Sequence, residues 1–395
     1  MTALETARAG RATGTSPADE SNDRWRRALV VGGVAYLASR VLVLVGAAIA
    51  AARSSTGGVL DALTVWDGEW YLSIVRDGYP SSVPADISSV GRWSEARVGF
   101  FPLYPLLVRF VDPCLPGGER VAAVVVNLLL GAALVLVVGL LARAWFGVRA
   151  AERAMVLVAL LPGSFVLSFA YSEALLLVLA AGALLAIHRR AWLSAGVLAA
   201  LATATRPNGV AIAAACVLAA VVAIRERREW RALVAPALAP LGLVAFHLYL
   251  GLRTGEQGVW FRVQRLVWEE HLTFGASTAW DLRHLLAGPD RTVDHLLTTL
   301  TVVAAVALVA AARKVRLPSP AWAYSIVVLV LMVLTSTVTA RPRFLYTAFP
   351  LVVALAAWWP HDTTRWQRGW QVLVVASGVG LVAVTALYGA YDAVP

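Results

Sequence analysis

Carboxylates lie among large aromatic side chains in the stretch WDGEWYLSIVRDGYP, which begins at Trp66. Asp67 and Glu69 are two positions apart in it, and Tyr71 and Tyr79 follow them. A carboxylate can act as a general base when its surroundings bring its pKa towards the working pH, and aromatic rings can stack on a sugar. The same composition fits an amphipathic surface helix with solvated acids. The residues of this stretch alone favour the surface helix.

Two further polar segments interrupt apolar sequence. Tyr171 and Glu173 fall at an expected turn between two apolar runs, where an acid is either a solvated helix cap or lines a cavity. Arg206 and Asn208 fall in the segment TRPNG. The planar guanidinium of Arg206 could clamp a phosphate, but Pro-Asn-Gly is also good chemistry for a hairpin turn. Both interpretations stay open for each segment.

Other arginines stand in unusual places. Arg341 and Arg343 form a second cationic turn, for which a plain turn is an equally simple interpretation. Arg40 falls near the middle of the first apolar run, where a charged group is costly and usually faces a cavity or a partner. A shifted or tilted first helix would remove that anomaly. Residues 100–105, FFPLYP, contain two prolines that break a regular helix, and we expect a structural role for them.

The composition indicates a membrane protein. Of the 395 residues, 59% are hydrophobic and 15% are charged, whereas about 25% are charged in soluble domains. The mean hydropathy is +0.71. Cys114 and Cys216 offer no disulfide pair and no metal-ligand spacing, so we expect no metal and no cofactor. The net charge of +10 comes from basic clusters between apolar runs, which predicts contact with a lipid bilayer and not with nucleic acid.

The apolar runs predict a polytopic all-α protein with eleven spans, several of them shorter than the roughly 20 residues of a full span: 28–52, 121–141, 154–169, 175–187, 191–205, 210–224, 233–252, 296–312, 321–338, 344–359 and 371–391. Basic residues gather in alternate short connections, which the positive-inside rule places in the cytoplasm. The N-terminus is then inside and the C-terminus outside. The domain prediction is a disordered cytoplasmic tail at 1–23 and a single transmembrane domain at 24–395, with long external loops at 53–120 and 253–295.

This topology places the isolated polar residues on one face of the membrane. They are Asp67, Glu69, Glu173, Arg206, Arg341 and Arg343. Arginines can hold a phosphate while a carboxylate activates a nucleophile. Their convergence would therefore suit a lipid-phosphate substrate, although spacing alone does not identify a reaction.

Four short motifs in order resemble the PIG-V family, the GPI mannosyltransferase II-like enzymes, which have bacterial members. The matching residues are Trp66, Asp67, Glu69, Gly78 and Tyr79; residues 100–105; Tyr171, Ser172, Glu173 and Ala174; and Arg206, Asn208 and Gly209. The resemblance is best from about residue 66 to 209. The last third of the chain matches only in general character, so the roles of Arg341 and Arg343 are inferred from their residue types.

The resemblance implies a GT-C glycosyltransferase fold with about eleven transmembrane helices and a large first extracytoplasmic loop. It implies a polyprenyl-phosphate-mannose donor, inversion and no metal. Carried over, Asp67 is the catalytic base. Glu69 and Glu173 would orient the acceptor or hold Asp67, and Arg206 would stabilise the leaving lipid phosphate. Trp66, Tyr71, Tyr79, Tyr171 and Asn208 would contribute to the substrate site. The acceptor would be an envelope lipid, glycan or protein outside the cell membrane.

Two other functions are compatible with the sequence. A transporter or flippase of a lipid-linked sugar would also have many spans, broken helices and an intramembrane arginine. The absence of a convincing inverted repeat and the two long loops on one face argue against it. A non-catalytic membrane subunit is the third interpretation. Replacing Asp67 by asparagine would separate these functions, because only an enzyme should lose sugar transfer while it still folds.

Overall fold

The computed structural model describes residues 17–54, 57–88, 93–289, 291–336 and 341–394. Most of these residues are helical. Across these ranges the only strand pairing is one antiparallel bridge between Leu272 and Thr335. The predicted all-α class is therefore confirmed.

Six helical segments of the described chain are long and apolar enough to cross a membrane: Ser21–Arg53, Gly118–Phe146, Pro207–Arg227, Trp230–Thr254, Val293–Ala312 and Thr364–Gly389. Four shorter apolar helices accompany them: α7 (Glu173–His188), α8 (Trp192–Thr203), α15 (Ser319–Leu334) and α17 (Phe349–Trp358). Each of the eleven predicted runs overlaps one or more helices. The polytopic helical fold is confirmed, and the count of eleven crossings stays a prediction.

The other α-helices are α1 (Pro17–Arg53), α2 (Val59–Ala62), α3 (Asp67–Asp77), α4 (Leu103–Val111), α5 (Gly118–Phe146), α6 (Val148–Leu160), α9 (Val210–Arg227), α10 (Val234–Leu238), α11 (Leu241–Thr254), α12 (Val259–Leu266), α13 (Ala276–Ala287), α14 (Val293–Ala312), α16 (Pro342–Thr347) and α18 (Thr364–Gly389). Short 3-10 turns are η1 (Trp93–Gly99), η2 (Asp112–Cys114), η3 (Pro162–Leu167), η4 (Pro207–Gly209) and η5 (Trp230–Leu233). Helix α1 begins inside the predicted tail 1–23, and residues 1–16 lie outside the described residues.

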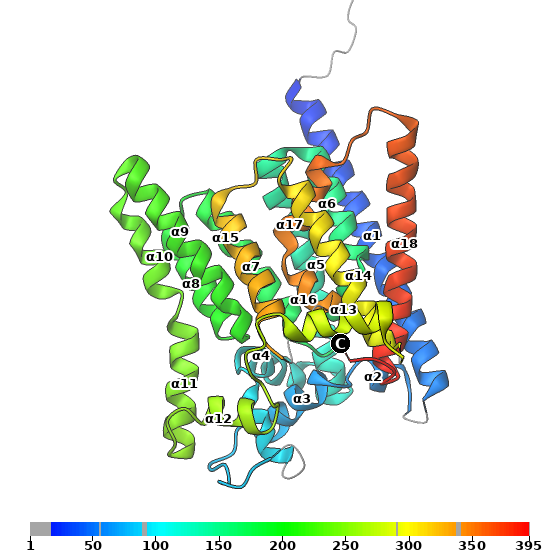
Figure 1. The fold of residues 1–395 in the computed structure, drawn as a ribbon. Helices are drawn as coiled ribbons and strands as arrows, with labels where there is room; N and C mark the ends of the chain where they lie inside the picture. Colours follow the sequence, from blue (N-terminus) through cyan, green and yellow to red (C-terminus); the bar gives the residue numbers. More distant parts are fainter. Residues whose placement is uncertain (1–16, 55–56, 89–92, 290, 337–340, 395) are drawn as a thin grey trace, which may run out of the picture.

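The bundle is built on close contacts between long helices. Helix α1 packs against α6 and α18, α5 packs against α6 and α7, and α9 packs against α15 (Figure 1). Small residues permit such approaches in membranes. A Cβ atom added at Gly46 of α1 would lie only 2.7 Å from the carbonyl oxygen of Val382 in α18. Glycine at this position therefore lets the first and last long helices meet.

An irregular segment interrupts the bundle between α6 and α7. Helix α6 ends at Leu160, and Pro162 begins the turn η3. Backbone polar groups inside a membrane must find partners within the protein. Arg40 of α1 supplies them: its Nη1 donates to the carbonyl oxygen of Ser164 at 3.1 Å and to Oγ of Ser168 at 2.8 Å. Arg40 is buried, so it faces polar partners and no shift of the first helix is needed.

The two predicted external loops form one layer below the bundle, at the bottom of Figure 1. The indole N–H of Trp260 in α12 donates to the carbonyl oxygen of Gly99 at 3.1 Å. Arg262 donates to the carbonyl oxygens of Val83 and Pro84 at 3.0 and 2.8 Å. The loops therefore reach each other across about 160 residues of chain and cover the ends of α7, α9 and α15.

Candidate active site

Two carboxylates and two arginines from four segments meet at the loop-covered end of the bundle. Asp67 begins α3, Glu173 begins α7, Arg206 precedes η4, and Arg343 lies in α16. Arg343 Nη1 lies 2.8 Å from Asp67 Oδ2, and Arg206 Nη1 lies 2.7 Å from Glu173 Oε1. Arg206 is also 3.6 Å from Asp67, and Arg343 is 3.5 Å from Glu173. We call these four residues the acid–arginine cluster.

The acid–arginine cluster balances its charges in a largely buried place. The side chain of Glu173 is 1% exposed and that of Asp67 is 19% exposed. Buried charges are costly unless they are paired, and here two negative groups face two positive ones. Burial alone would lower the pKa of the Arg206 and Arg343 guanidiniums. The neighbouring carboxylates outweigh burial and raise the pKa of both, so both arginines stay charged.

The backbone just before Asp67 has an unusual conformation. Trp66 has φ 58° and ψ −124°, a combination that residues with a side chain rarely adopt. Its indole N–H donates to the carbonyl oxygen of Tyr388 at 2.9 Å, and its ring lies 4.9 Å from the ring of Tyr391, centroid to centroid. These contacts from the end of α18 hold the turn. This turn places Asp67 at the N-terminus of α3, where a negative charge is favoured.

A cavity of about 550 Å³ opens beside the acid–arginine cluster, a size typical of small-molecule sites. Seven of the predicted site residues line it: Trp66, Asp67, Tyr71, Arg206, Asn208, Arg341 and Arg343. Aromatic side chains from both external loops complete the wall, among them Phe100, Trp260 and Trp268. The structure thus brings together residues that the sequence spreads over about 280 positions.

Tyr171 and Glu173 lie behind this wall. Glu173 holds both arginines of the cluster from the protein side. The guanidinium of Arg343 lies over the buried ring of Tyr171, 5.2 Å from its centroid. The hydroxyl of Tyr71 shares a hydrogen bond of 2.6 Å with Ser172 Oγ, which also accepts from Arg206 at 3.3 Å. These contacts fix the arginines and leave their outer sides to the cavity.

Glu69 and Tyr79 are not brought to this cavity. Glu69 accepts a hydrogen bond from the hydroxyl of Tyr391 and lines a separate cavity of about 390 Å³ together with Arg76 and Arg120. Tyr79 is buried, and its hydroxyl donates to the carbonyl oxygen of Phe100 at 2.6 Å. Its place is in the aromatic core of the loop layer. Neither side chain lines the cavity beside Asp67.

Sequence reasoning does not select the part of the wall that comes from the second loop. Trp260, Gln264, Trp268 and Glu270 line the cavity, and none of these four is among the candidate site residues taken from the sequence. Trp260 and Gln264 are one helical turn apart, which is a weak signal of a shared face. Their contact with the cavity depends on how α12 packs on η1, and no local pattern reveals that packing.

The chemistry of the site is that of a carboxylate beside cations. Asp67 could accept a proton, and Arg206 and Arg343 could hold an anion next to it. Arg341 is fixed at the rim, where its Nη1 donates to the carbonyl oxygen of Asp294 at 2.7 Å and to Thr298 Oγ1 at 2.8 Å. Across the described ranges, no three His, Cys, Asp or Glu side chains gather as possible metal ligands.

The fold resembles those of proteins whose structures have been solved. One of them is ArnT from Cupriavidus metallidurans, bound to undecaprenyl phosphate, which superposes with a TM-score of 0.54 at 15% identity. The match covers 90% of this chain and 74% of ArnT. The apo oligosaccharyltransferase of Archaeoglobus fulgidus superposes with a TM-score of 0.51 at 12% identity. The match covers 90% of this chain but only 56% of that enzyme. These likenesses support the predicted GT-C fold.

The family is shown by sequence. A search of curated proteins gave no match. The family model that matches is that of glycosyltransferase family 87, over residues 101–337, which is more than half of the chain. The superfamily expectation is thus confirmed, while the finer resemblance to PIG-V stays a prediction. The chain belongs to glycosyltransferase family 87 and is an integral membrane glycosyltransferase of the GT-C type.

Proposed function

We propose that the protein transfers mannose from a polyprenyl-phosphate-mannose donor to a hydroxyl of an envelope lipid, glycan or protein, with inversion at C1. The observation that carries this proposal is the acid–arginine cluster, because one carboxylate and two guanidiniums face a single cavity. ArnT, whose fold is similar, is described as bound to undecaprenyl phosphate. The choice of mannose rests on the four motifs that resemble the PIG-V family.

The geometry of Asp67 suits a general base. Both recorded ion pairs of Asp67, to Arg343 and to Arg206, use Oδ2, which leaves Oδ1 to take the proton of the acceptor hydroxyl. As that proton moves to Asp67, the acceptor oxygen forms a bond to C1 of the sugar. The bond from C1 to the phosphate oxygen breaks, and the lipid phosphate leaves with the electron pair. Arg206 and Arg343 stabilise the charge that develops on the phosphate.

An apolar cleft gives room for the lipid chain of the donor. It has a volume of about 670 Å³ and lies between α14 and α15, lined by residues such as Val306, Ile326 and Val330. Its lining includes Met332 and Val333, which lie in the sequence between the active-cavity residues Leu331 and Thr335. An isoprenoid chain in this cleft gains about 0.8 kcal/mol for each methylene-sized group that it buries. A phosphate attached to that chain would lie at the cavity mouth.

The proposed orientation follows from the basic residues at the other end of the bundle. Helices α7 and α9 run from Glu173 and Val210 beside the cavity to His188 and Arg227 at the opposite end. The opposite end carries the arginine clusters, which the positive-inside rule assigns to the cytoplasm. The active cavity is then on the extracytoplasmic face of the cell membrane.

The test is a transfer assay with protein reconstituted in vesicles, polyprenyl-phosphate-mannose as donor, cell-envelope extract as acceptor, and mass spectrometry of the products. General-base catalysis contributes about 100- to 10,000-fold, so Asp67→Asn should lower the rate at least about 100-fold. Asp77→Asn is the matched control, because Asp77 ends the same helix α3, pairs with Arg97 at 3.1 Å and lies outside the cavity. Asp67→Asn protein with the wild-type rate would disprove the base assignment. Transfer from a polyprenyl-phosphate-glucose donor alone would disprove mannose.

A further inference from the structure

A second polar cavity lies at the end of the bundle opposite the acid–arginine cluster. It has a volume of about 460 Å³ and is lined by residues of α7, α9, α15 and the start of α8. His188, Arg190 and Arg227 line it together with Trp192 and Ser319. Helix α9 has 18 residues, so Arg227 lies about 27 Å along the helix from its end beside the catalytic cavity. It takes no part in the proposed transfer.

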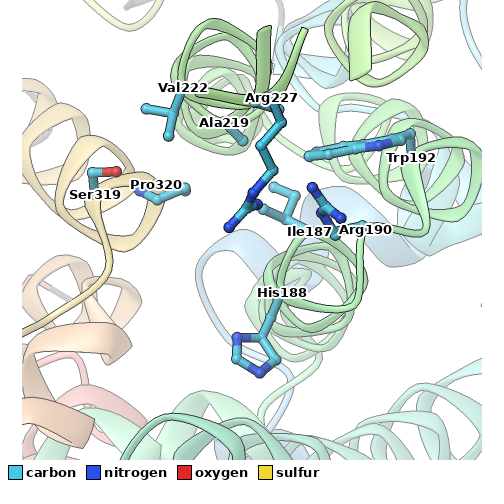
Figure 2. Close-up of a pocket in the computed structure, with 10 residues that line it drawn as sticks. Ile187, His188, Arg190, Trp192, Ala219, Val222, Arg227, Ser319 and Pro320 are labelled. Carbon is cyan, nitrogen blue, oxygen red and sulfur yellow. The ribbon is translucent and has the colours of Figure 1, made fainter. Parts of the chain in front are cut away.

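Two arginine side chains, those of Arg190 and Arg227, line this basic cavity. Figure 2 shows the side chain of Arg227 extending from α9 towards Ile187, with the guanidinium of Arg190 beside it, while the ring of His188 points away from both. Like charges brought together repel each other, and a bound anion would relieve that repulsion. Within the part of the chain that the structure describes, no ion pair is recorded for Arg227.

One wall of the basic cavity is held in place. Arg190 Nη2 lies 2.8 Å from Glu229 Oε2, and the indole N–H of Trp192 donates to Glu229 Oε1 at 2.7 Å. Glu229 therefore fixes both the arginine and the tryptophan. The surroundings remain positive, since residues 187–192 and 225–231 contain six arginines and two glutamates. An arginine that is already positioned loses little freedom when it binds an anion.

The cavity also has an apolar side. Ile187, Ala219, Val222 and Pro320 line it, and they belong to helices that run into the membrane. Orienting a membrane protein requires basic residues at the cytoplasmic end of the bundle, but it does not require that they line a cavity. A volume of about 460 Å³ is in the range of small-molecule sites. Basic pockets between membrane helices on the cytoplasmic side are typical sites for phosphate-bearing head groups.

We propose that this basic cavity binds a phosphate group, with Arg227 and Arg190 as its cationic ligands. The phosphate could belong to the head group of an anionic phospholipid or to a free phosphate ion. Binding would join the ends of α7, α9 and α15, whose other ends lie beside the acid–arginine cluster. The proposal does not depend on the transferase reaction, because it concerns a ligand at the opposite end of these helices.

Thermal unfolding of purified protein in detergent tests the proposal. The additions are phosphatidylglycerol, phosphatidylcholine with the same acyl chains, and inorganic phosphate. Wild-type protein should gain thermal stability from phosphatidylglycerol and not from phosphatidylcholine, and Arg227→Gln should need at least about tenfold more lipid for half of the shift. Arg225→Gln is the matched control, because it removes the same charge from the same helix turn, and Arg225 does not line the cavity.

The outcomes are distinct. A shift with phosphatidylglycerol that depends on Arg227 assigns a lipid head group, and a shift with inorganic phosphate that depends on Arg227 assigns a free ion. Arg227→Lys keeps the charge and should retain part of the effect, which guards against a variant that merely folds badly. The proposal is overturned if neither addition stabilises the wild type, or if Arg227→Gln and Arg225→Gln respond alike.

Discussion

Replacing Glu173 by glutamine would test whether buried charge balance holds the acid–arginine cluster together. The substitution keeps the shape of the side chain and removes one negative charge at a position where the side chain is 1% exposed. Arg206 and Arg343, at 2.7 and 3.5 Å from Glu173 Oε1, would then share Asp67 as their only carboxylate within the cluster. A net positive charge would remain in a largely buried place.

The size of the effect follows from these distances. At an effective dielectric constant of about 20, unit charges 2.7 and 3.5 Å apart attract by about 6 and about 5 kcal/mol. Removing the carboxylate also returns several kcal/mol of desolvation cost. The net loss in the free energy of unfolding should therefore be about 3–5 kcal/mol, the range found when one partner of a buried pair is removed.

The assay is unfolding of the purified protein by titration with sodium dodecyl sulfate in mixed micelles, followed by circular dichroism. Glu119→Gln is the matched control, because Glu119 Oε1 lies 2.8 Å from Arg76 Nη1 but the side chain of that arginine is 49% exposed. Such surface pairs contribute about 0–1 kcal/mol. If Glu173→Gln costs no more than Glu119→Gln, the reasoning from burial is refuted. Restored stability in Glu173→Gln/Arg206→Gln would support it, since that variant is neutral again.

Three further outcomes are expected. Glu69→Gln should keep the transfer rate within about threefold, because Glu69 faces a separate cavity; a loss of about 100-fold would instead place Glu69 in catalysis. Val306→Trp should fill the α14–α15 cleft and raise KM for a long-chain polyprenyl donor but not for a short-chain analogue, whereas Val303→Trp, on the same helix and outside the cleft, should change neither. A hydrogen bond from Arg262 lowers the pKa of Glu256, so the folded state binds that proton less readily than the unfolded state does. This stabilisation is fully present above the ordinary carboxyl pKa of about 4.3 and is lost as pH falls through the lower folded value. Glu256→Gln should therefore flatten the melting temperature between about pH 5 and 3, and an unchanged pH profile would contradict the pairing.

Hydropathy predicts most of this fold, because a membrane requires long apolar helices whatever their partners. It does not predict the break at Pro162. The run 154–169 is mostly apolar, with only Ser164 and Ser168 as polar side chains, yet the helix ends at Leu160 and η3 follows. The break is stable because Arg40, more than 100 residues earlier, supplies hydrogen bonds to it. Such a partner cannot be found from the local sequence.

In the candidate site too, some features can be predicted from the sequence and others depend on the tertiary structure. Residue types alone select Asp67, Arg206 and Arg343, because charged groups in an apolar chain are few. Spacing could have separated Asp67 from Glu69, since residues two apart on a helix do not face each other, and both lie in α3. The burial of Tyr79 depends instead on Gly78, whose φ of 69° redirects the chain after the helix. A turn of this kind has no reliable signal in a single sequence.

The contact between Trp66 and Tyr388 has a consequence for biogenesis. The two residues are 322 positions apart, and a ribosome adds about 5–20 residues per second. The turn before Asp67 therefore waits on the order of half a minute for the helix that holds it. During that time the turn lacks the contacts to Tyr388 and Tyr391 that hold it in the finished structure. The site around Asp67 would thus reach its final geometry only after α18 has been inserted. Insertion of α18 would then be the last step in the assembly of an active protein.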